Sequence, residues 1–200
     1  MKCLWGLPAL LTAACAHAAT VELRVSDRAG HPLADAVATL EPAQGRLAVA
    51  PMKGVEISQA HREFAPSVTV VTVGTAVAFP NFDRVRHHVY SFSPAKQFEL
   101  KLYSGVPAAP VVFDKPGVVV LGCNIHDQMV AWVVVVDTPL HATSGADGRV
   151  RLASVPPGDY RLRVWHAGLP PGDAPAATAL NVAADDIAQD VRLPVGETAQ

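Results

Sequence analysis

The chain has 200 residues, of which 50% are hydrophobic, 17% charged and 6% aromatic. This composition is typical of a globular protein and excludes a disordered chain, a collagen and a coiled coil. The formal net charge of −2 offers no basic surface for nucleic acid, so we expect no nucleic-acid partner. Fourteen Gly and 17 Pro favour many turns and leave little room for long helices.

Residues 1–18 have the pattern of a secretory signal peptide. Lys2 precedes an apolar stretch from Cys3 to Ala14, and Ala16-His17-Ala18 fits the small-residue pattern of a cleavage site. We therefore expect a periplasmic protein whose mature chain starts near Ala19. No other apolar run is long enough to span a bilayer, so we expect no integral membrane segment after cleavage.

The cysteines allow a second interpretation of this segment. Leu11-Thr12-Ala13-Ala14-Cys15 loosely resembles a lipobox, which would make Cys15 a lipid anchor, although Thr12 is a poor residue for the apolar position. Cleavage after Ala18 instead leaves Cys123 alone in the mature chain. In an oxidising compartment, a lone thiol is a liability unless it is buried, bonded to another chain or bound to a metal.

Strand patterns dominate the rest of the chain. Apolar and polar residues alternate in residues 21–25, 55–57, 98–102, 149–152 and 160–165. Continuous apolar runs at 118–121 and 130–136 predict strands that are buried on both faces. Because no segment keeps a helical period for three turns, the sequence predicts an all-β fold built as a sandwich or as two sandwiches.

The two ends of the chain have similar sequence patterns. Residues 27–40 (DRAGHPLADAVATL) and 143–168 (TSGADGRVRLASVPPGDYRLRVWHAG) resemble two parts of the carboxypeptidase-regulatory or Cna-B type β-sandwich. This resemblance implies a discontinuous sandwich made of residues 19–42 and 139–200, with a second domain at residues 55–138 inserted into it. Insertion at a loop costs little closure entropy. The alternative is that two unrelated β-extensions flank a core.

The middle of the chain holds the motif with the clearest chemistry. Cys123, His126 and Met129 lie within seven residues, between the two apolar runs. A thiolate, an imidazole and a thioether form a soft ligand set that suits copper better than zinc, because a thioether is a poor zinc ligand. A blue-copper site also needs a second histidine from elsewhere in the fold, and His87 and His88 are the two candidates. Since adjacent strand residues face opposite sides, only one of them should reach the metal.

Residues 55–138 resemble the cupredoxin family, as seen in the methylamine-utilisation-type proteins. The resemblance is carried by Phe79-Pro80-Asn81 with His87-His88-Val89, by Phe113-Asp114-Lys115-Pro116-Gly117 and by the Cys-x2-His-x2-Met loop, which is similar to the amicyanin-type ligand loop. It implies a Greek-key β-sandwich that binds one type 1 copper through His87, Cys123, His126 and a weak axial Met129. The sequence departs from the family at His88, where an asparagine usually ties the two ligand loops together.

The resemblance implies a periplasmic protein that transfers single electrons to or from a redox partner protein, with His126 as the electron port. We do not expect the protein to be an enzyme, because a full set of protein ligands leaves no open position on the metal for a substrate. Two alternatives use the same residues. One is copper storage or delivery, and the other is an adhesion or scaffolding sandwich with a structural copper.

Overall fold

The computed structural model describes residues 18–170 and 176–196, so nearly all of the expected signal peptide lies outside the described residues. The described part forms strands and no helix, which confirms the all-β class. It therefore contains no helix that could cross a membrane. In chain order, the strands are β1 (Ala19–Ser26), β2 (Val37–Pro42), β3 (Val55–Glu56), β4 (Ser58–Ala60), β5 (Glu63–Ala65), β6 (Val68–Thr72), β7 (Thr75–Ala78), β8 (His87–Ser93), β9 (Lys96–Tyr103), β10 (Val111–Phe113), β11 (Gly117–Gly122), β12 (Val130–Val136), β13 (His141–Thr143), β14 (Arg149–Val155), β15 (Gly158–Trp165), β16 (Thr178–Val182) and β17 (Ile187–Arg192).

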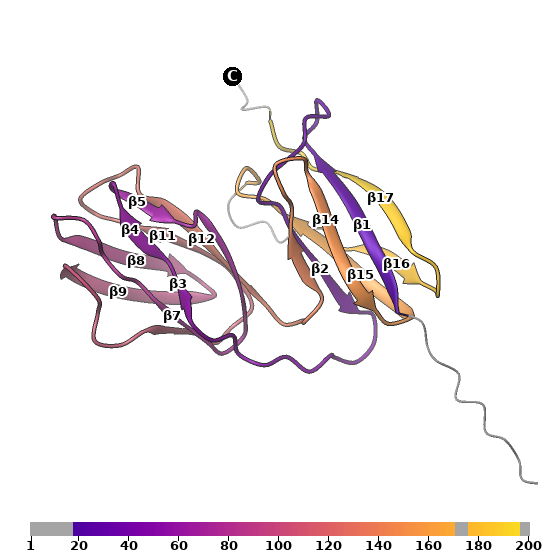
Figure 1. Ribbon diagram of the computed structural model, residues 1–200, viewed down its shortest axis with the longest axis horizontal. Coiled ribbons are helices and arrows are strands. Elements are labelled where there is room, and N and C mark those ends of the chain that lie inside the picture. Colours follow the sequence, from indigo (N-terminus) through magenta and orange to yellow (C-terminus); the bar gives the residue numbers. More distant parts are fainter. Residues whose placement is uncertain (1–17, 171–175, 197–200) are drawn as a thin grey trace, which may run out of the picture.

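The strands from the two ends of the chain form one sandwich, which we call the flanking unit (Figure 1). One sheet has the order β14-β1-β17 and the other has the order β13-β2-β15-β16. The alternating apolar residues of β1 and β15 point into the space between the sheets. There Val21, Leu23 and Leu162 join a buried aliphatic core. The period of two in these segments therefore gives each sheet one apolar face.

The strands from the middle of the chain form the second sandwich, which we call the central unit. A sheet of order β10-β7-β3 faces a five-stranded sheet of order β6-β12-β11-β8-β9, and β4 pairs with β5 in a small hairpin. The core between the sheets contains Phe79, Phe113 and Leu121. Cys123 and Met129 belong to this same core, so the ligand motif begins and ends inside the sandwich.

The chain leaves the flanking unit and returns to it at neighbouring points. The chain leaves β2 close to Leu40 and returns to the flanking unit at Thr138–Leu140. The Thr138 hydroxyl donates a hydrogen bond to the Leu40 carbonyl at 2.7 Å, and the Leu40 amide donates one to the Leu140 carbonyl at 2.9 Å. Because the two crossing points are held together in this way, the central unit occupies what is topologically a loop of the flanking unit.

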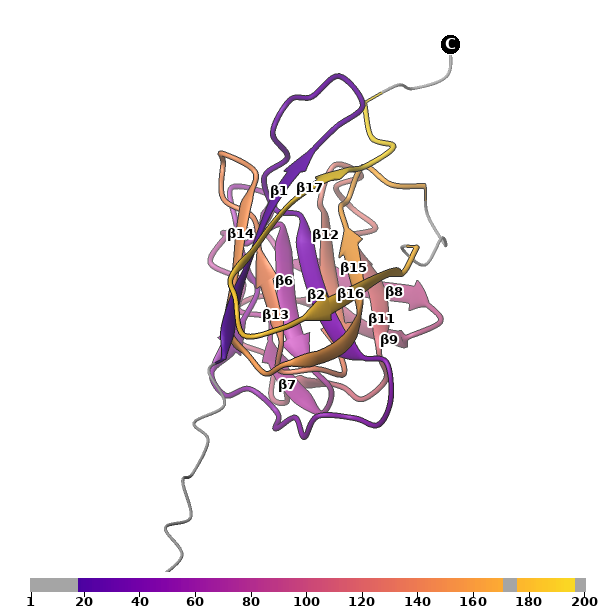
Figure 2. The same cartoon turned by 90° about the vertical axis from the view of Figure 1, so that its right-hand side faces the viewer.

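The two units contact each other through an apolar interface. Figure 2 views the molecule from the side of the flanking unit, which lies in front of the central unit. Val134 and Val136 of β12 meet Val37 of β2 and Trp165 of β15, and all four side chains are buried. The ring of Trp132 lies 6.5 Å from the ring of Trp165, centroid to centroid. These contacts explain the apolar outer face of β12, because the flanking unit covers it.

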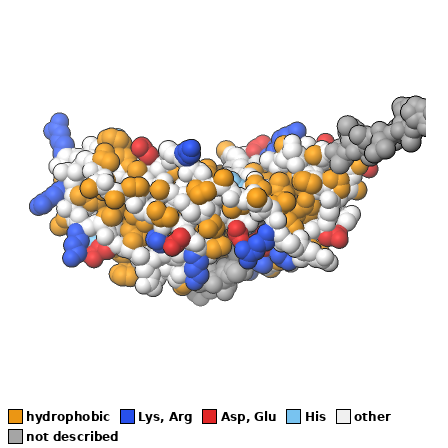
Figure 3. All heavy atoms as spheres, turned by 90° about the horizontal axis from the view of Figure 1, so that it is seen from below, with side chains coloured by type: hydrophobic (Ala, Val, Ile, Leu, Met, Phe, Trp, Pro, Cys, Tyr) orange, Lys and Arg blue, Asp and Glu red, His pale blue; other side chains and the backbone are white. Residues whose placement is uncertain are grey.

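The prediction that both apolar runs are buried on both faces is only partly right. The flanking unit covers the outer face near Val134 and Val136, but Val120 of β11 and Val130 of β12 remain about 40% exposed. Figure 3 shows one face of the molecule, on which apolar side chains of both units lie among charged side chains of both signs. A continuous apolar run therefore indicates burial of the sheet only over the length that a second layer covers.

We expect Trp165→Ala to lower the free energy of unfolding by about 3–5 kcal/mol, because it removes a buried indole from the interface between the units. Urea denaturation followed by circular dichroism measures this change. Phe92→Ala is the control, since Phe92 is 79% exposed and its loss should cost no more than about 0.5 kcal/mol. Equal effects of the two substitutions would contradict the interface.

Candidate metal centre

The loop of residues 123–129 connects β11 to β12 at one end of the central unit. Cys123 follows the last residue of β11 and is 3% exposed, whereas Met129 precedes β12 and is 1% exposed. Between them the chain turns back on itself, and the Met129 amide donates a hydrogen bond to the His126 carbonyl at 2.9 Å. The two strands thus fix both ends of the loop, and the turn brings His126 back over the core.

His87 reaches the loop from the neighbouring strand. It is the first residue of β8, which pairs antiparallel with β11, and Tyr90 lies opposite Gly122. The His87 side chain is fully buried, and its Nδ1 lies 3.9 Å from the Cys123 Sγ. The rings of His87 and His126 meet edge to face, with their centroids 5.1 Å apart. Strand pairing therefore brings together residues that lie 36 positions apart.

The three side chains present donor atoms that fit one metal ion. One donor atom from each of His87, Cys123 and His126 lies within 4.8 Å of the other two. Metal–ligand bonds of about 2.0–2.3 Å place donor atoms about 3.5–4 Å apart around one ion, close to the Cys123–His87 distance. The Nδ1 of His126 is buried without a hydrogen-bond partner. A buried, unsatisfied nitrogen is costly, and a metal would satisfy it.

Met129 belongs to the same buried cluster as Cys123. The donor atoms of three of the four expected ligands thus lie close together, and the fourth ligand belongs to the same apolar core as Cys123.

His88 points to the other side of the sheet. Its Nε2 lies 2.9 Å from the Glu99 Oε1 of β9, and its ring meets the Tyr90 ring at a centroid distance of 5.7 Å. The contact with Glu99 lacks hydrogen-bond geometry, so it acts as an ion pair only when His88 is protonated. His88 thus faces Glu99 of β9, and strand alternation turns His87 to the opposite side, toward Cys123.

The outer nitrogen of His87 contacts a carboxylate. The Nε2 of His87 lies 2.8 Å from the Asp83 Oδ2, and Asp83 also accepts backbone hydrogen bonds from His61 and Arg62. Partial burial raises the pKa of Asp83. The hydrogen bonds from the Arg62 amide, the His87 ring and the His61 amide outweigh that effect, and the pKa lies below the usual 3.8. Asp83 is therefore ionised at neutral pH.

A buried polar cluster lies on the other side of the site. The Tyr103 hydroxyl donates a hydrogen bond to the Phe79 carbonyl at 2.7 Å and accepts one from the Gln59 amide. Burial raises the pKa of Tyr103 to about 12; the hydrogen bond from Gln59 opposes this rise and the charge of Cys123 adds to it. Tyr103 therefore stays protonated at neutral pH and adds no negative charge near the Cys123 sulfur.

Asn81 holds the loop that leads into His87. Its Nδ2 donates to the carbonyls of Val85 (2.9 Å) and Tyr103 (3.0 Å), and its Oδ1 accepts from the Asp83 amide at 2.9 Å. The side chain is 4% exposed. One buried amide thus fixes both ends of the segment that carries Asp83.

Sequence reasoning did not single out Asp83, Gln59 or Tyr103. The four-residue spacing between Asp83 and His87 carries a signal only on a helix, and these residues lie in a loop and at the start of a strand. Gln59 and Tyr103 come from strands with no motif of their own. Tertiary structure alone brings them to the site.

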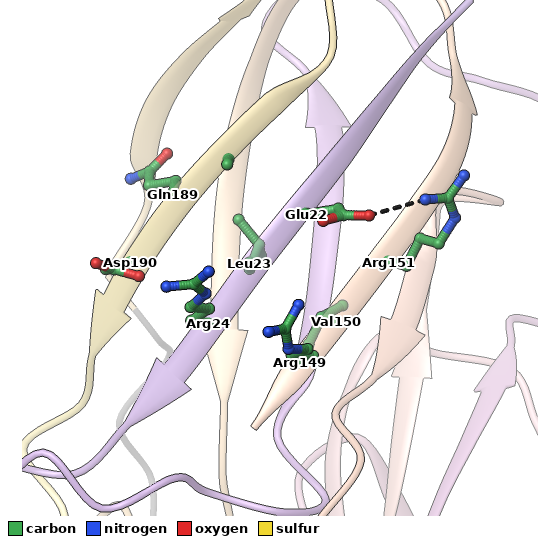
Figure 4. Close-up of a pocket in the computed structure, with 9 residues that line it drawn as sticks. Glu22, Leu23, Arg24, Arg149, Val150, Arg151, Gln189 and Asp190 are labelled. Carbon is green, nitrogen blue, oxygen red and sulfur yellow. Dashed lines mark hydrogen bonds and ion pairs between the residues drawn. The ribbon is translucent and has the colours of Figure 1, made fainter. Parts of the chain in front are cut away.

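A hollow lies on the outer face of the β14-β1-β17 sheet, in the flanking unit (Figure 4). It is lined by Arg24, Arg149 and Asp190, and by an ion pair in which Arg151 Nη1 lies 2.8 Å from Glu22 Oε1. Its charges are of both signs, and it contains neither histidine nor cysteine. It offers no catalytic or metal-binding arrangement comparable to the first site.

No protein-family model matches the chain, and neither does any curated protein. Among solved structures, the chain is similar to a copper-containing nitrite reductase from Thermus scotoductus SA-01, with 26% identity and a TM-score of 0.39 over 48% of this chain; it spans only 25% of that protein. A purple cupredoxin from Nitrosopumilus maritimus has 23% identity and a TM-score of 0.36, covering 41% of this chain and 99% of its own. A reduced Cu(I) form of an amicyanin variant has 23% identity and a TM-score of 0.38, covering 50% of this chain and 98% of its own.

We expect Asn81→Ala to lower the free energy of unfolding by about 2–3 kcal/mol, because two carbonyls and one amide lose a buried partner. Urea denaturation measures the loss, and hydrogen exchange should show faster opening of residues 81–87. The matched control is Asn181→Ala, which removes one exposed hydrogen bond to Asp159 and should change stability by no more than about 0.5 kcal/mol. An equally mild effect of Asn81→Ala would contradict the role of this side chain.

Proposed function

We propose that the central unit binds one type 1 copper ion and that the protein transfers single electrons in the periplasm. His87, Cys123 and His126 are the strong ligands and Met129 the weak axial one. The observation that carries this proposal is the convergence of a buried thiol and two imidazoles, one of them with an unsatisfied buried nitrogen. One thiolate, two imidazoles and a thioether form the donor set of blue-copper electron-transfer sites.

Copper in such a site supplies a Cu(II)/Cu(I) couple, and the chain's part is to hold its ligands still. Cys123 and Met129 are anchored by β11 and β12, and His87 by β8. All three side chains are buried, which excludes water from this side of the site. Ligands that are fixed in this way move little when the charge of the ion changes.

His126 is the ligand nearest the surface. It is partly exposed, and its neighbour Ile125 is 46% exposed. Phe82 and Val85, in the loop before β8, are exposed as well. Exposed apolar side chains on the loop that carries His126 and on the loop before β8 would favour contact with a redox partner protein, which supports His126 as the electron port.

The burial of the thiol supports a role outside enzyme catalysis. In space, the His87 imidazole lies between the Cys123 thiol and the Asp83 carboxylate. Cysteine hydrolases place a thiol, an imidazole and a third polar group in the same order. However, Cys123 is 3% exposed and His87 fully buried, so a substrate could not reach the sulfur. We propose that these side chains serve a metal and not a nucleophilic reaction.

The same anchoring supports electron transfer over copper delivery. Delivery requires ligands that a partner can reach and replace, whereas two of the strong ligands here lie in the core. A purely scaffolding role would give no reason for a buried imidazole nitrogen without a partner.

We expect the mature protein loaded with Cu(II) to show an intense visible band from thiolate-to-copper charge transfer, and Cys123→Ser to abolish it. Cyclic voltammetry should show a reversible one-electron couple, because the ligands stay in place in both oxidation states. A colourless protein that binds one Cu(II) would contradict the type 1 assignment. Rapid loss of Cu(I) to a chelator, without reversible voltammetry, would favour delivery.

We expect His87→Ala to abolish the visible band and His88→Ala only to perturb it, because His87 faces Cys123 and His88 faces Glu99. The two substitutions remove the same side chain from adjacent residues of one strand, so each is the control for the other. Absorption spectra of the copper-loaded variants provide the measurement. If the band survives in His87→Ala and disappears in His88→Ala, then His88 is the ligand. That result would contradict the assignment of His87.

A further inference from the structure

Asp83 joins His87 to a part of the chain that contributes no metal ligand. Its two carboxylate oxygens accept three hydrogen-bond contacts: Oδ1 from the His61 amide at 2.8 Å, Oδ2 from the Arg62 amide at 2.9 Å, and Oδ2 from the His87 ring at 2.8 Å. The Asp83 side chain is 17% exposed, and the two amides belong to exposed turn residues, whereas the His87 ring is fully buried. One carboxylate therefore connects the β4–β5 hairpin, the loop before β8 and the buried imidazole.

The contact with His87 determines which ring nitrogen carries the proton. An ionised carboxylate can only accept, so the neutral His87 ring must hold its proton on Nε2. The lone pair then lies on Nδ1, which is the atom that faces the Cys123 sulfur. A carboxylate on the outer nitrogen also fixes the ring orientation and makes the inner nitrogen a stronger donor.

The contacts with the hairpin keep the carboxylate in place. His61 and Arg62 connect β4 to β5 with φ angles of 56° and 62°, a left-handed conformation that residues other than glycine rarely adopt. Both of their amides point at Asp83 and hold its two oxygens. Because both oxygens are held, the carboxylate cannot rotate away from His87.

We infer that Asp83 is the positioning residue of the metal site, which keeps His87 in the tautomer that presents Nδ1 to the ion. The β4–β5 turn acts through Asp83 as a support for the same ligand. This inference rests on the proposed metal-binding function for its consequence, although the tautomer itself is a property of the metal-free protein.

The first test needs no substitution. Long-range proton–nitrogen NMR correlation of the His87 ring, in metal-free protein at neutral pH, shows which nitrogen is protonated. We expect the proton on Nε2. A ring protonated on Nδ1 alone would overturn the inference.

The second test compares Asp83→Asn with Asp27→Asn. An asparagine at position 83 has one oxygen for three donors, and its NH2 group can donate to Nε2 and so drive the His87 proton to Nδ1. We expect this tautomer change, together with a fall of about 10–100-fold in Cu(I) affinity, measured by competition with a chromogenic chelator. Asp27 is the matched control, because it holds the amide and the ring Nδ1 of His31 at the same spacing in the flanking unit. Asp27→Asn should leave copper affinity unchanged.

The outcomes separate this inference from the proposed function. If the wild-type protein binds no copper but its His87 tautomer depends on Asp83, the proposed function fails and the control of the tautomer stands. If the wild-type copper protein shows the intense band, while Asp83→Asn keeps both the tautomer and the affinity, the inference is overturned and the proposed function stands. Should Asp83→Asn fail to fold, the wild-type tautomer still decides.

Discussion

The antiparallel pairing of β8 with β11 is the constraint on which the metal site depends. It sets Tyr90 opposite Gly122, and the Tyr90 ring lies so close that a Cβ on residue 122 would come within 2.9 Å of it. A side chain at this position would require the Tyr90 ring to move. His87 lies three residues before Tyr90, and Cys123 directly follows Gly122. The pairing of the two strands therefore sets how far the His87 imidazole lies from the Cys123 thiol.

The flanking unit stabilises the same sheet, because it covers apolar side chains of β12. β12 carries valines on both of its faces, and a sheet that exposes such a face to water tends to associate with other chains. Val134 and Val136 avoid this because they pack on Val37 and Trp165. The hydrogen bonds between Leu40 and residues 138–140 hold together the two segments at which the chain leaves and re-enters the flanking unit. The flanking unit thus shields part of β12, the strand that follows the loop of residues 123–129, from water.

The sequence was informative where chemistry and period coincide in a short stretch. Cys123, His126 and Met129 lie within one short segment between two apolar runs, so the sequence alone predicts that they lie close together in space. Strand alternation left a choice between His87 and His88, and the resemblance to cupredoxins favoured His87. Asp83, Gln59 and Tyr103 could not be predicted, because long-range pairing brings them to the site from segments without a motif. The exposure of Val120 could not be predicted either, since it depends on where the flanking unit ends.

The central claim is that His87, Cys123 and His126 hold one copper ion together. X-ray absorption spectroscopy at the copper edge tests it most directly, because it reports the atoms bound to the metal without depending on colour or activity. We expect one short sulfur contact and two imidazole nitrogens around the copper, in both the Cu(II) and the Cu(I) protein, with little change between the two states. Copper that lacks a sulfur ligand, or that gains oxygen ligands on oxidation, would contradict this claim.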